Sequence, residues 1–379
     1  MENKTVFLVG GGTGGHIVPV FRIYKELSKQ KNLRLFIIGA GSPIEKDFFA
    51  GIPGYIPIRS GKMRRSITIK NITEFINFIA GMFQSLFLIR KNRPDLIFLK
   101  GGYVSWPFCF WAKWLKIPYF IHESDAVMGA SNRFAAKNAV IIFTGFPVSS
   151  YPKVDKNKIR FVGQLIKIEV EDKEEDYDFG FKGNKQVIFV TGGSQGSRKI
   201  NRIIYKSLPR LLEKFYLIHQ TGTLDYNEAI RTRSSLTPKI RQSYYVRDFL
   251  DWIGDSDLMA NALEKADLVI ARAGATTIAE IAGLKKPMIL IPYKHAAADH
   301  QKENASIMEK EKAAAVILED GLTADFLSSK VEKLFSEPEK LKSLGQNAYK
   351  VFPLDGVEKV SQEIIHFLKV EDPEFIEGK

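Results

Sequence analysis

The chain has 379 residues, of which 45% are hydrophobic, and it carries a formal net charge of +12. This length suits two α/β domains, each with a sizeable core. The single cysteine, Cys109, excludes an intrachain disulfide, and no signal peptide is recognised at the N-terminus, so we expect a cytoplasmic protein.

The excess positive charge lies in the N-terminal half of the chain. Residues 1–163 contain 24 Lys and Arg against 9 Asp and Glu, whereas residues 164–379 contain 31 against 34. A half with this surplus favours an anionic partner, namely phospholipid, nucleic acid or a pyrophosphate substrate.

A glycine-rich turn follows the first predicted strand, residues 6–9. Five of the six residues 10–15 are glycine, and His16 lies where an amphipathic helix begins. The bare backbone admits a diphosphate or a sugar, and the helix N-terminus favours negative charge. His16 is placed to take a proton from a bound group. A turn that only packs would need one or two glycines.

The same turn also matches the spacing of the dinucleotide-binding fingerprint. That fingerprint requires an acidic residue at the end of the second strand, about 20 residues further on. The second predicted strand, residues 33–38, runs into Gly39-Ala40-Gly41 and is not closed by Asp or Glu. The sequence therefore disfavours NAD.

Residues 72–89 predict a helix that is apolar on nearly all sides and carries Phe75, Ile79 and Phe83. Basic residues flank it on both sides. Because the segment is short and contains polar residues, an interfacial helix on an anionic membrane fits better than a membrane span. The alternative is a buried crossover helix, which we favour for one face. Nucleic acid is disfavoured because the basic residues flank aliphatic surface and do not alternate with stacking aromatics.

Short apolar strands continue along the chain, and the opening pattern of a strand followed by a glycine turn then occurs a second time. After a charged stretch at residues 167–186, a strand at 186–190 enters a second glycine turn at 191–197. Two such starts, about 180 residues apart, predict two Rossmann-like halves with a boundary near Gly163. The remaining predicted strands are residues 96–99, 119–121, 140–143, 216–219, 244–246, 267–271 and 287–291.

Polar residues follow several of these strands, at the edge where open α/β sheets bind ligands. Backbone amides of residues 275–277 can point at a diphosphate, and Glu280 can accept hydrogen bonds from a ribose. The alternative is a capping box formed by Thr277 and Glu280, which in isolation is the commoner arrangement. The sequence His122-Glu123-Ser124-Asp125 makes a poor metal site and a reasonable acceptor-side cluster. Residues 255–257, Asp-Ser-Asp, are interpreted as a solvated turn.

Six motifs occur in an order that resembles glycosyltransferase family 28, the bacterial N-acetylglucosaminyltransferases of peptidoglycan synthesis (the MurG family). The resemblance covers nearly the whole chain. The motifs are residues 11–16 (GGTGGH), 101–105 (GGYVS), 122–125 (HESD), 192–197 (GGSQGS), 272–280 (RAGATTIAE) and 300–305 (HQKENA).

The resemblance implies a GT-B fold, in which two Rossmann-like α/β domains with mostly parallel sheets face a central cleft. Residues 1–163, completed by a C-terminal helix at about 353–370, would bind lipid I and the membrane, and residues 164–352 would bind UDP-GlcNAc. The implied reaction transfers N-acetylglucosamine with inversion to the C4 hydroxyl of MurNAc in lipid I, giving lipid II, without a cofactor or metal. The implied location is the cytoplasmic face of the plasma membrane, where other cell-wall synthesis and division proteins are candidate partners and nucleic acid is not.

The resemblance also assigns roles to single residues. His16 is the first candidate for the general base and Asp125 the second, while Glu123 could orient a histidine. The acceptor side would include His16, Tyr103, His122 and Glu123. The donor side would include Thr13, Gly14, Gly15, Asp125, Lys167, Ser194, Leu250, Ala275, Thr276, Thr277, Glu280, His300 and Gln301.

The chain departs from the family pattern in three places. Gln164-Leu165-Ile166-Lys167 replaces the usual Asn-Pro-Val-Arg, so Lys167 keeps the charge of the arginine and loses its bidentate fork. Asp125 stands where many members have Asn, and the stretch 248–264 looks longer than usual. The rival hypotheses are another UDP-sugar lipid glycosyltransferase and a non-enzymatic membrane scaffold.

Overall fold

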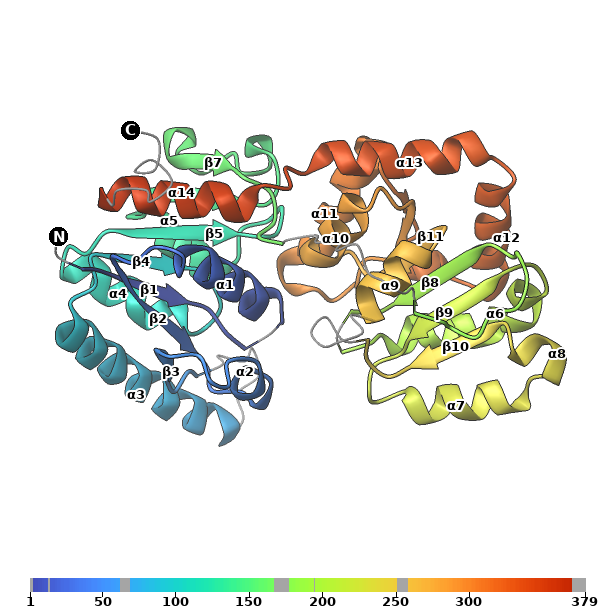
Figure 1. Ribbon diagram of the computed structural model, residues 1–379, viewed down its shortest axis with the longest axis horizontal. Coiled ribbons are helices and arrows are strands. Elements are labelled where there is room, and N and C mark those ends of the chain that lie inside the picture. The colour runs from blue at the N-terminus through green and yellow to red at the C-terminus, as the bar shows by residue number, and fades with distance from the viewer. Residues whose placement is uncertain are drawn as a thin grey trace. The chain divides into compact units, whose positions relative to one another are not determined.

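The computed structural model describes residues 3–12, 14–61, 69–166, 177–193, 195–250 and 258–369. These residues form two compact units (Figure 1). The described residues up to 166, together with 353–369, make the first unit, and those from 177 to 352 make the second. Thr13, Lys167, Ser194 and the turn at 255–257 lie outside the described residues.

The first unit is built on a seven-stranded sheet in which all neighbouring strands are parallel, in the order β3-β2-β1-β4-β5-β6-β7. The strand order reverses between β1 and β4, and their carboxyl ends form a switch point of the kind at which α/β sheets bind ligands. The strands are β1 (Lys4–Val9), β2 (Leu33–Gly39), β3 (Tyr55–Pro57), β4 (Leu96–Leu99), β5 (Tyr119–Glu123), β6 (Ile141–Thr144) and β7 (Ile159–Phe161).

Helices cover both faces of this sheet. Because side chains alternate along a strand, Val6 and Leu8 of β1 face α1 and α14, whereas Phe7 contacts Phe108 of α4. Figure 1 shows the red C-terminal helix α14 returning to the blue and green elements of the first unit, where it packs on α1. The helices are α1 (Gly14–Leu27), α2 (Pro43–Phe48), α3 (Ile69–Asn92), α4 (Ser105–Trp114), α5 (Ala130–Ala136) and α14 (Gly356–Leu368), with short 3-10 turns at Val148–Ser150 and Lys156–Lys158.

The second unit repeats this plan with a six-stranded, all-parallel sheet in the order β10-β9-β8-β11-β12-β13. Its strands are β8 (Val187–Thr191), β9 (Tyr216–Gln220), β10 (Tyr244–Arg247), β11 (Leu268–Ala271), β12 (Met288–Leu290) and β13 (Ala315–Val316). Its helices are α6 (Arg198–Lys214), α7 (Tyr226–Ser235), α8 (Pro238–Arg241), α9 (Leu258–Lys265), α10 (Ala275–Gly283), α11 (His300–Lys310), α12 (Ala324–Phe335) and α13 (Pro338–Val351), with 3-10 turns at Ala297–Asp299 and Glu319–Gly321.

The prediction of two parallel-sheet α/β halves is confirmed. Three strands that the hydrophobic pattern did not predict, β3, β7 and β13, lie at edges of the two sheets. Each is only two or three residues long. Segments this short carry too few alternating positions to give a periodic signal.

Candidate active site

A buried carboxylate organises the first glycine turn. Gly12 has a φ of +92°, and its N–H donates to Glu45 Oε1. The other oxygen, Oε2, accepts from Gly41 N at 2.8 Å and from the Tyr55 hydroxyl at 3.2 Å. Glu45 is fully buried. The turn that we expected to bind a ligand is therefore also held by the protein itself. Sequence reasoning missed Glu45 because an acidic residue on a short helix gives no distinctive pattern.

His16 stands in the first turn of α1, immediately after Gly14 and Gly15, which begin the helix. Its ring lies against the backbone of Gly102, where an added Cβ would be 3.5 Å from both Cε1 and Nδ1. Burial and then the charge of Lys100 lower the pKa of His16 to about 4, and a hydrogen bond with the backbone of Gly11 opposes them. The imidazole is therefore neutral at neutral pH and able to accept a proton.

Lys100 is a second group that sequence reasoning missed. It follows β4, is 2% exposed, and donates from Nζ to Ser124 Oγ at 2.6 Å. Burial lowers the pKa of Lys100 to about 8, against the opposing charges of Glu123 and Asp125. The carboxyl ends of β1, β4 and β5 thus bring a lysine together with the predicted histidines and carboxylates.

Glu123 holds the loop that follows β5. Its Oε1 accepts from Asp125 N at 3.0 Å, and its Oε2 accepts from Gly129 N at 2.9 Å and Asn132 Nδ2 at 3.0 Å. Burial, followed by the charge of Asp125, raises the pKa of this carboxyl. These contacts fix the backbone around Asp125, which is itself partly exposed.

His122 lies behind the surface. Its side chain is fully buried, and Nε2 lies 3.0 Å from the carbonyl oxygen of Gly163. Since a carbonyl only accepts, Nε2 carries the proton, and Nδ1 has no hydrogen-bond partner among the described residues. Burial and the charge of Lys100 hold the pKa of His122 well below its usual value. Of the predicted acceptor-side residues, Tyr103 is exposed at 44%.

In the second unit, α10 begins at Ala275, with Gly274 as its N-cap. The first helical hydrogen bond runs from Ile278 N to Gly274 O, so the N–H groups of residues 275–277 precede it. The capping-box alternative is wrong, because Thr277 lies inside the helix and not at its cap. Glu280 is partly exposed one turn further on.

Gln220, which the sequence analysis did not single out, joins two predicted donor loops. Its Oε1 accepts from Leu250 N at 3.0 Å, and its Nε2 donates to Gly193 O at 3.1 Å. Gln220 and Leu250 are both fully buried. The amide thus ties the second glycine turn to the residue expected near uracil.

The loop after β12 is fastened in a similar way. Gln301 Oε1 accepts from Tyr293 N at 2.9 Å. Asn304, which is fully buried, donates to Ala273 O at 3.0 Å and so ties α11 to the turn before α10. His300 begins α11 and is partly exposed. The predicted donor residues of the second unit that the structure describes therefore lie at the carboxyl ends of the second sheet, whereas Gly14, Gly15 and Asp125 lie in the first unit.

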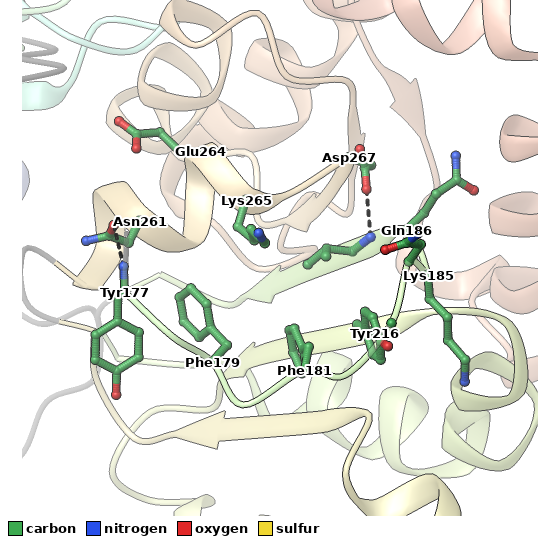
Figure 2. A pocket seen from close by; sticks show the side chains of 13 residues that line it. Tyr177, Phe179, Phe181, Lys185, Gln186, Tyr216, Asn261, Glu264, Lys265 and Asp267 are labelled. Carbon is green, nitrogen blue, oxygen red and sulfur yellow. Dashed lines mark hydrogen bonds between the residues drawn. The ribbon is translucent and has the colours of Figure 1, made fainter. Parts of the chain in front are cut away.

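A pocket of about 600 Å³ lies at the other end of the strands of that sheet, where they begin. Figure 2 shows Tyr177, Phe179 and Phe181 in a row along it, and the ring of Phe181 stacks on Tyr216 at 4.5 Å. Its strand residues stand at amino ends: Tyr216 begins β9, and Asp267 precedes β11. This pocket is therefore separate from the predicted donor residues.

The exposed face of α3 is apolar. Phe75, Ile79 and Phe83 are exposed at 63%, 39% and 68%, and Ile72, Ile76 and Phe87 are exposed beside them. The opposite face is attached through Gly81, where a Cβ would strike the carbonyl of Arg59. The prediction that one face of this helix is buried therefore agrees with the face that carries Gly81, while the opposite, apolar face is exposed. Among the described residues, the segment Ile72–Asn92 is long and apolar enough to cross a membrane, a property that core helices and signal sequences share.

Two Rossmann-like units with polar residues at the carboxyl ends of parallel strands have the architecture of the GT-B fold. Residues 6–144 match the glycosyltransferase family 28 N-terminal domain, and residues 187–360 match the family 28 C-terminal domain. The chain belongs to glycosyltransferase family 28.

Two of its relatives carry the same name. The UDP-N-acetylglucosamine–N-acetylmuramyl-(pentapeptide) pyrophosphoryl-undecaprenol N-acetylglucosamine transferase 2 of Bacillus cereus is 35% identical over 90% of this chain and 94% of its own length. The transferase of the same name, without the number, from Geobacter sulfurreducens is 31% identical over 97% of this chain and 100% of its own length. The crystal structure of Acinetobacter baumannii MurG superimposes with a TM-score of 0.72 at 22% identity, covering 96% of this chain and 99% of that one.

Proposed function

We propose that this protein transfers N-acetylglucosamine from UDP-GlcNAc to the C4 hydroxyl of MurNAc in lipid I, giving lipid II. The observation that carries the proposal is the match to relatives named for this reaction over 90–97% of the chain. Residues of both predicted substrate sets stand at the carboxyl ends of parallel strands, which supports it.

The second unit is the proposed donor domain. The amides of residues 275–277 at the start of α10 would bind the diphosphate, and Glu280 would accept hydrogen bonds from the ribose hydroxyls. Leu250 would meet the uracil through its backbone, on a loop that Gln220 holds in place. Gln301 and His300 would lie near the sugar.

The first unit, completed by α14, is the proposed acceptor domain. In a direct displacement, the C4 oxygen attacks C1 of GlcNAc, the bond from C1 to the phosphate oxygen breaks, and UDP leaves with the electron pair. Backbone amides and the helix N-terminus stabilise the charge on UDP. His16, neutral and partly exposed, is the proposed base that takes the hydroxyl proton, with Asp125 as the second candidate.

Glu123 and His122 are proposed to support this site from behind. Glu123 accepts three hydrogen bonds from the loop and from α5, and His122 is fully buried against Gly163. Neither arrangement presents the side chain to an acceptor. Tyr103, which is exposed on the loop after β4, is the better candidate for direct contact with lipid I.

The exposed face of α3 is the proposed membrane contact. Its apolar side chains end beside Arg90 and Lys91 in the last turn, both exposed, as expected for a helix at an anionic surface. Peripheral attachment to the cytoplasmic face of the plasma membrane would bring the acceptor unit to its lipid substrate.

The test is transfer of radiolabelled GlcNAc from UDP-GlcNAc to a short-chain lipid I analogue. We expect a labelled disaccharide lipid. Diacylglycerol serves as the competing acceptor, and glycosylation of diacylglycerol in place of lipid I would favour a different lipid glycosyltransferase. Binding of UDP-GlcNAc without any transfer would favour a scaffold.

A further inference from the structure

The site contains a buried ammonium that the proposed reaction does not use. Lys100 continues the β4 ladder, with its N–H bonded to Val9 O at 2.8 Å, and its side chain is 2% exposed. Gly10 makes room for it, since a Cβ there would lie 2.9 Å from Lys100 Cβ. Burying a lysine costs free energy unless nearby groups compensate its charge. Its Nζ bonds to a neutral hydroxyl, that of Ser124.

The ionisable groups around Lys100 come from several elements. His16 comes from α1, His122 and Glu123 come from β5, and Asp125 comes from the turn after it. Two imidazoles, whose pKa values the charge of Lys100 lowers after burial, and two carboxylates, which act on the pKa of Lys100 itself, therefore surround this ammonium.

We propose that Lys100 is a positioning residue for the transfer reaction: its hydrogen bond to Ser124 holds the turn that carries Asp125, and its buried charge acts on His16. The proposal rests on the proposed function, because a positioning role presupposes the transfer reaction. The burial of Lys100 and its hydrogen bond to Ser124 are features of the structure. One cation, buried behind the surface, would act on both candidate bases without touching a substrate.

The perturbed histidines support this arrangement. Burial contributes most to the low pKa of His16, and the Lys100 charge is the second cause. The same two causes, in the same order, lower the pKa of His122. Removing the charge while keeping the side chain should therefore let His16 protonate at higher pH, and so lose its basic form at the acidic end of the working range.

The experiment compares Lys100→Met, a neutral side chain of similar length, with the wild type. Ring-proton NMR titration of the ligand-free protein, with the His16 signal assigned from His16→Gln, should show the midpoint rising by about one pH unit. The acidic limb of kcat/KM should move upward with it, while KM for UDP-GlcNAc stays within about twofold because the donor contacts lie on other residues. Lys113→Met, at an exposed lysine of the same unit, is the matched control and should shift neither.

Two further variants separate the effect of the Lys100 charge from that of its hydrogen bond to Ser124. Ser124→Ala keeps the ammonium, so it should slow transfer without moving the His16 midpoint. If Lys100→Met does not fold, Lys100→Gln keeps a donor toward Ser124 and should show the same titration shift. An unchanged His16 midpoint in a folded neutral variant would overturn the proposal even if transfer is slow. Because the titration needs no substrate, a wild type that transfers no GlcNAc would refute the proposed function and leave this test standing.

Discussion

His16 is the residue on which the proposed chemistry depends most directly. His16→Ala should lower turnover by about 10²–10⁴, the usual contribution of a positioned general base. The affinity for UDP-GlcNAc should change little, because the proposed contacts to the diphosphate are backbone amides of the second unit. Turnover and donor binding should be measured on folded protein, with His366→Ala, at an exposed histidine of α14, as the control.

The pH profile adds a second check on His16. Because protonation removes the base, activity must fall as the pH drops through its pKa. Because the pKa of His16 is lowered to about 4, kcat/KM should retain its neutral-pH value at pH values well below 6.5, the pKa of an unperturbed imidazole. Turnover of His16→Ala within about threefold of the wild type would transfer the role of base to Asp125.

Glu280 tests the donor assignment at the same scale. Glu280→Ala should weaken UDP-GlcNAc binding by about 1.5–3 kcal/mol, since two ribose hydroxyls lose a charged acceptor. The structure favours this outcome because α10 is capped by Gly274, so Glu280 is not part of a capping box. Donor titration and thermal melting should be run side by side. Normal affinity together with a lowered melting temperature would make Glu280 structural.

At the scale of single elements, α3 carries the proposed membrane contact. Replacing Phe75, Ile79 and Phe83 with Ser should reduce binding to anionic vesicles without unfolding the protein, because these side chains are 39–68% exposed. Salt should weaken wild-type binding by screening, while the apolar contribution persists.

The matched control is a triple Ser variant at exposed apolar residues of the second unit: Leu224, Leu318 and Phe326. It should bind vesicles like the wild type. Loss of the circular dichroism spectrum in the α3 variant would indicate that the face is part of a core, and a wild type that ignores vesicles of high anionic content would refute membrane binding by this face.

At the scale of the whole molecule, buried neutral histidines make stability depend on pH. His122 in the first unit and His219 in the second are both fully buried. Burial, with Lys100 for His122, lowers the pKa of both, that of His219 to about 3. The unfolded chain binds protons at these positions below pH 6.5 and the folded chain does not, so each of these histidines should cost its unit up to about 1.4 kcal/mol per pH unit as the pH falls below that value.

Urea unfolding between pH 7 and pH 5 measures this loss. In the first unit, His16, whose pKa is lowered to about 4, adds a second loss, and Glu123, whose pKa is raised by burial, offsets at most one of the two. The first unit should therefore depend on pH at least as steeply as the second. His219 bonds Tyr244 at 2.8 Å and Asn201 at 3.0 Å, which holds it in the folded core. A stability that stays flat over this range would contradict neutral burial of the two histidines.

The sequence by itself determined the features that depend on neighbouring residues. Continuous apolar runs followed by glycine turns identify buried parallel strands, so β1 and β8, the two-sheet plan and the family motifs could all be recognised. It also placed His16 and residues 275–277 where helices begin, because strand-to-helix turns have a local signature. The order of the motifs led to the family without any knowledge of contacts.

The tertiary structure alone decided which distant groups meet. Glu45 enters the glycine turn from α2, Lys100 lies between β5 and α1, and Gln220 joins two loops. It also placed His122 inside the core and left one face of α3 exposed. These facts arise from contacts between residues far apart in the chain, and hydrophobic periodicity carries no information about which buried polar groups lie together or which apolar face remains uncovered.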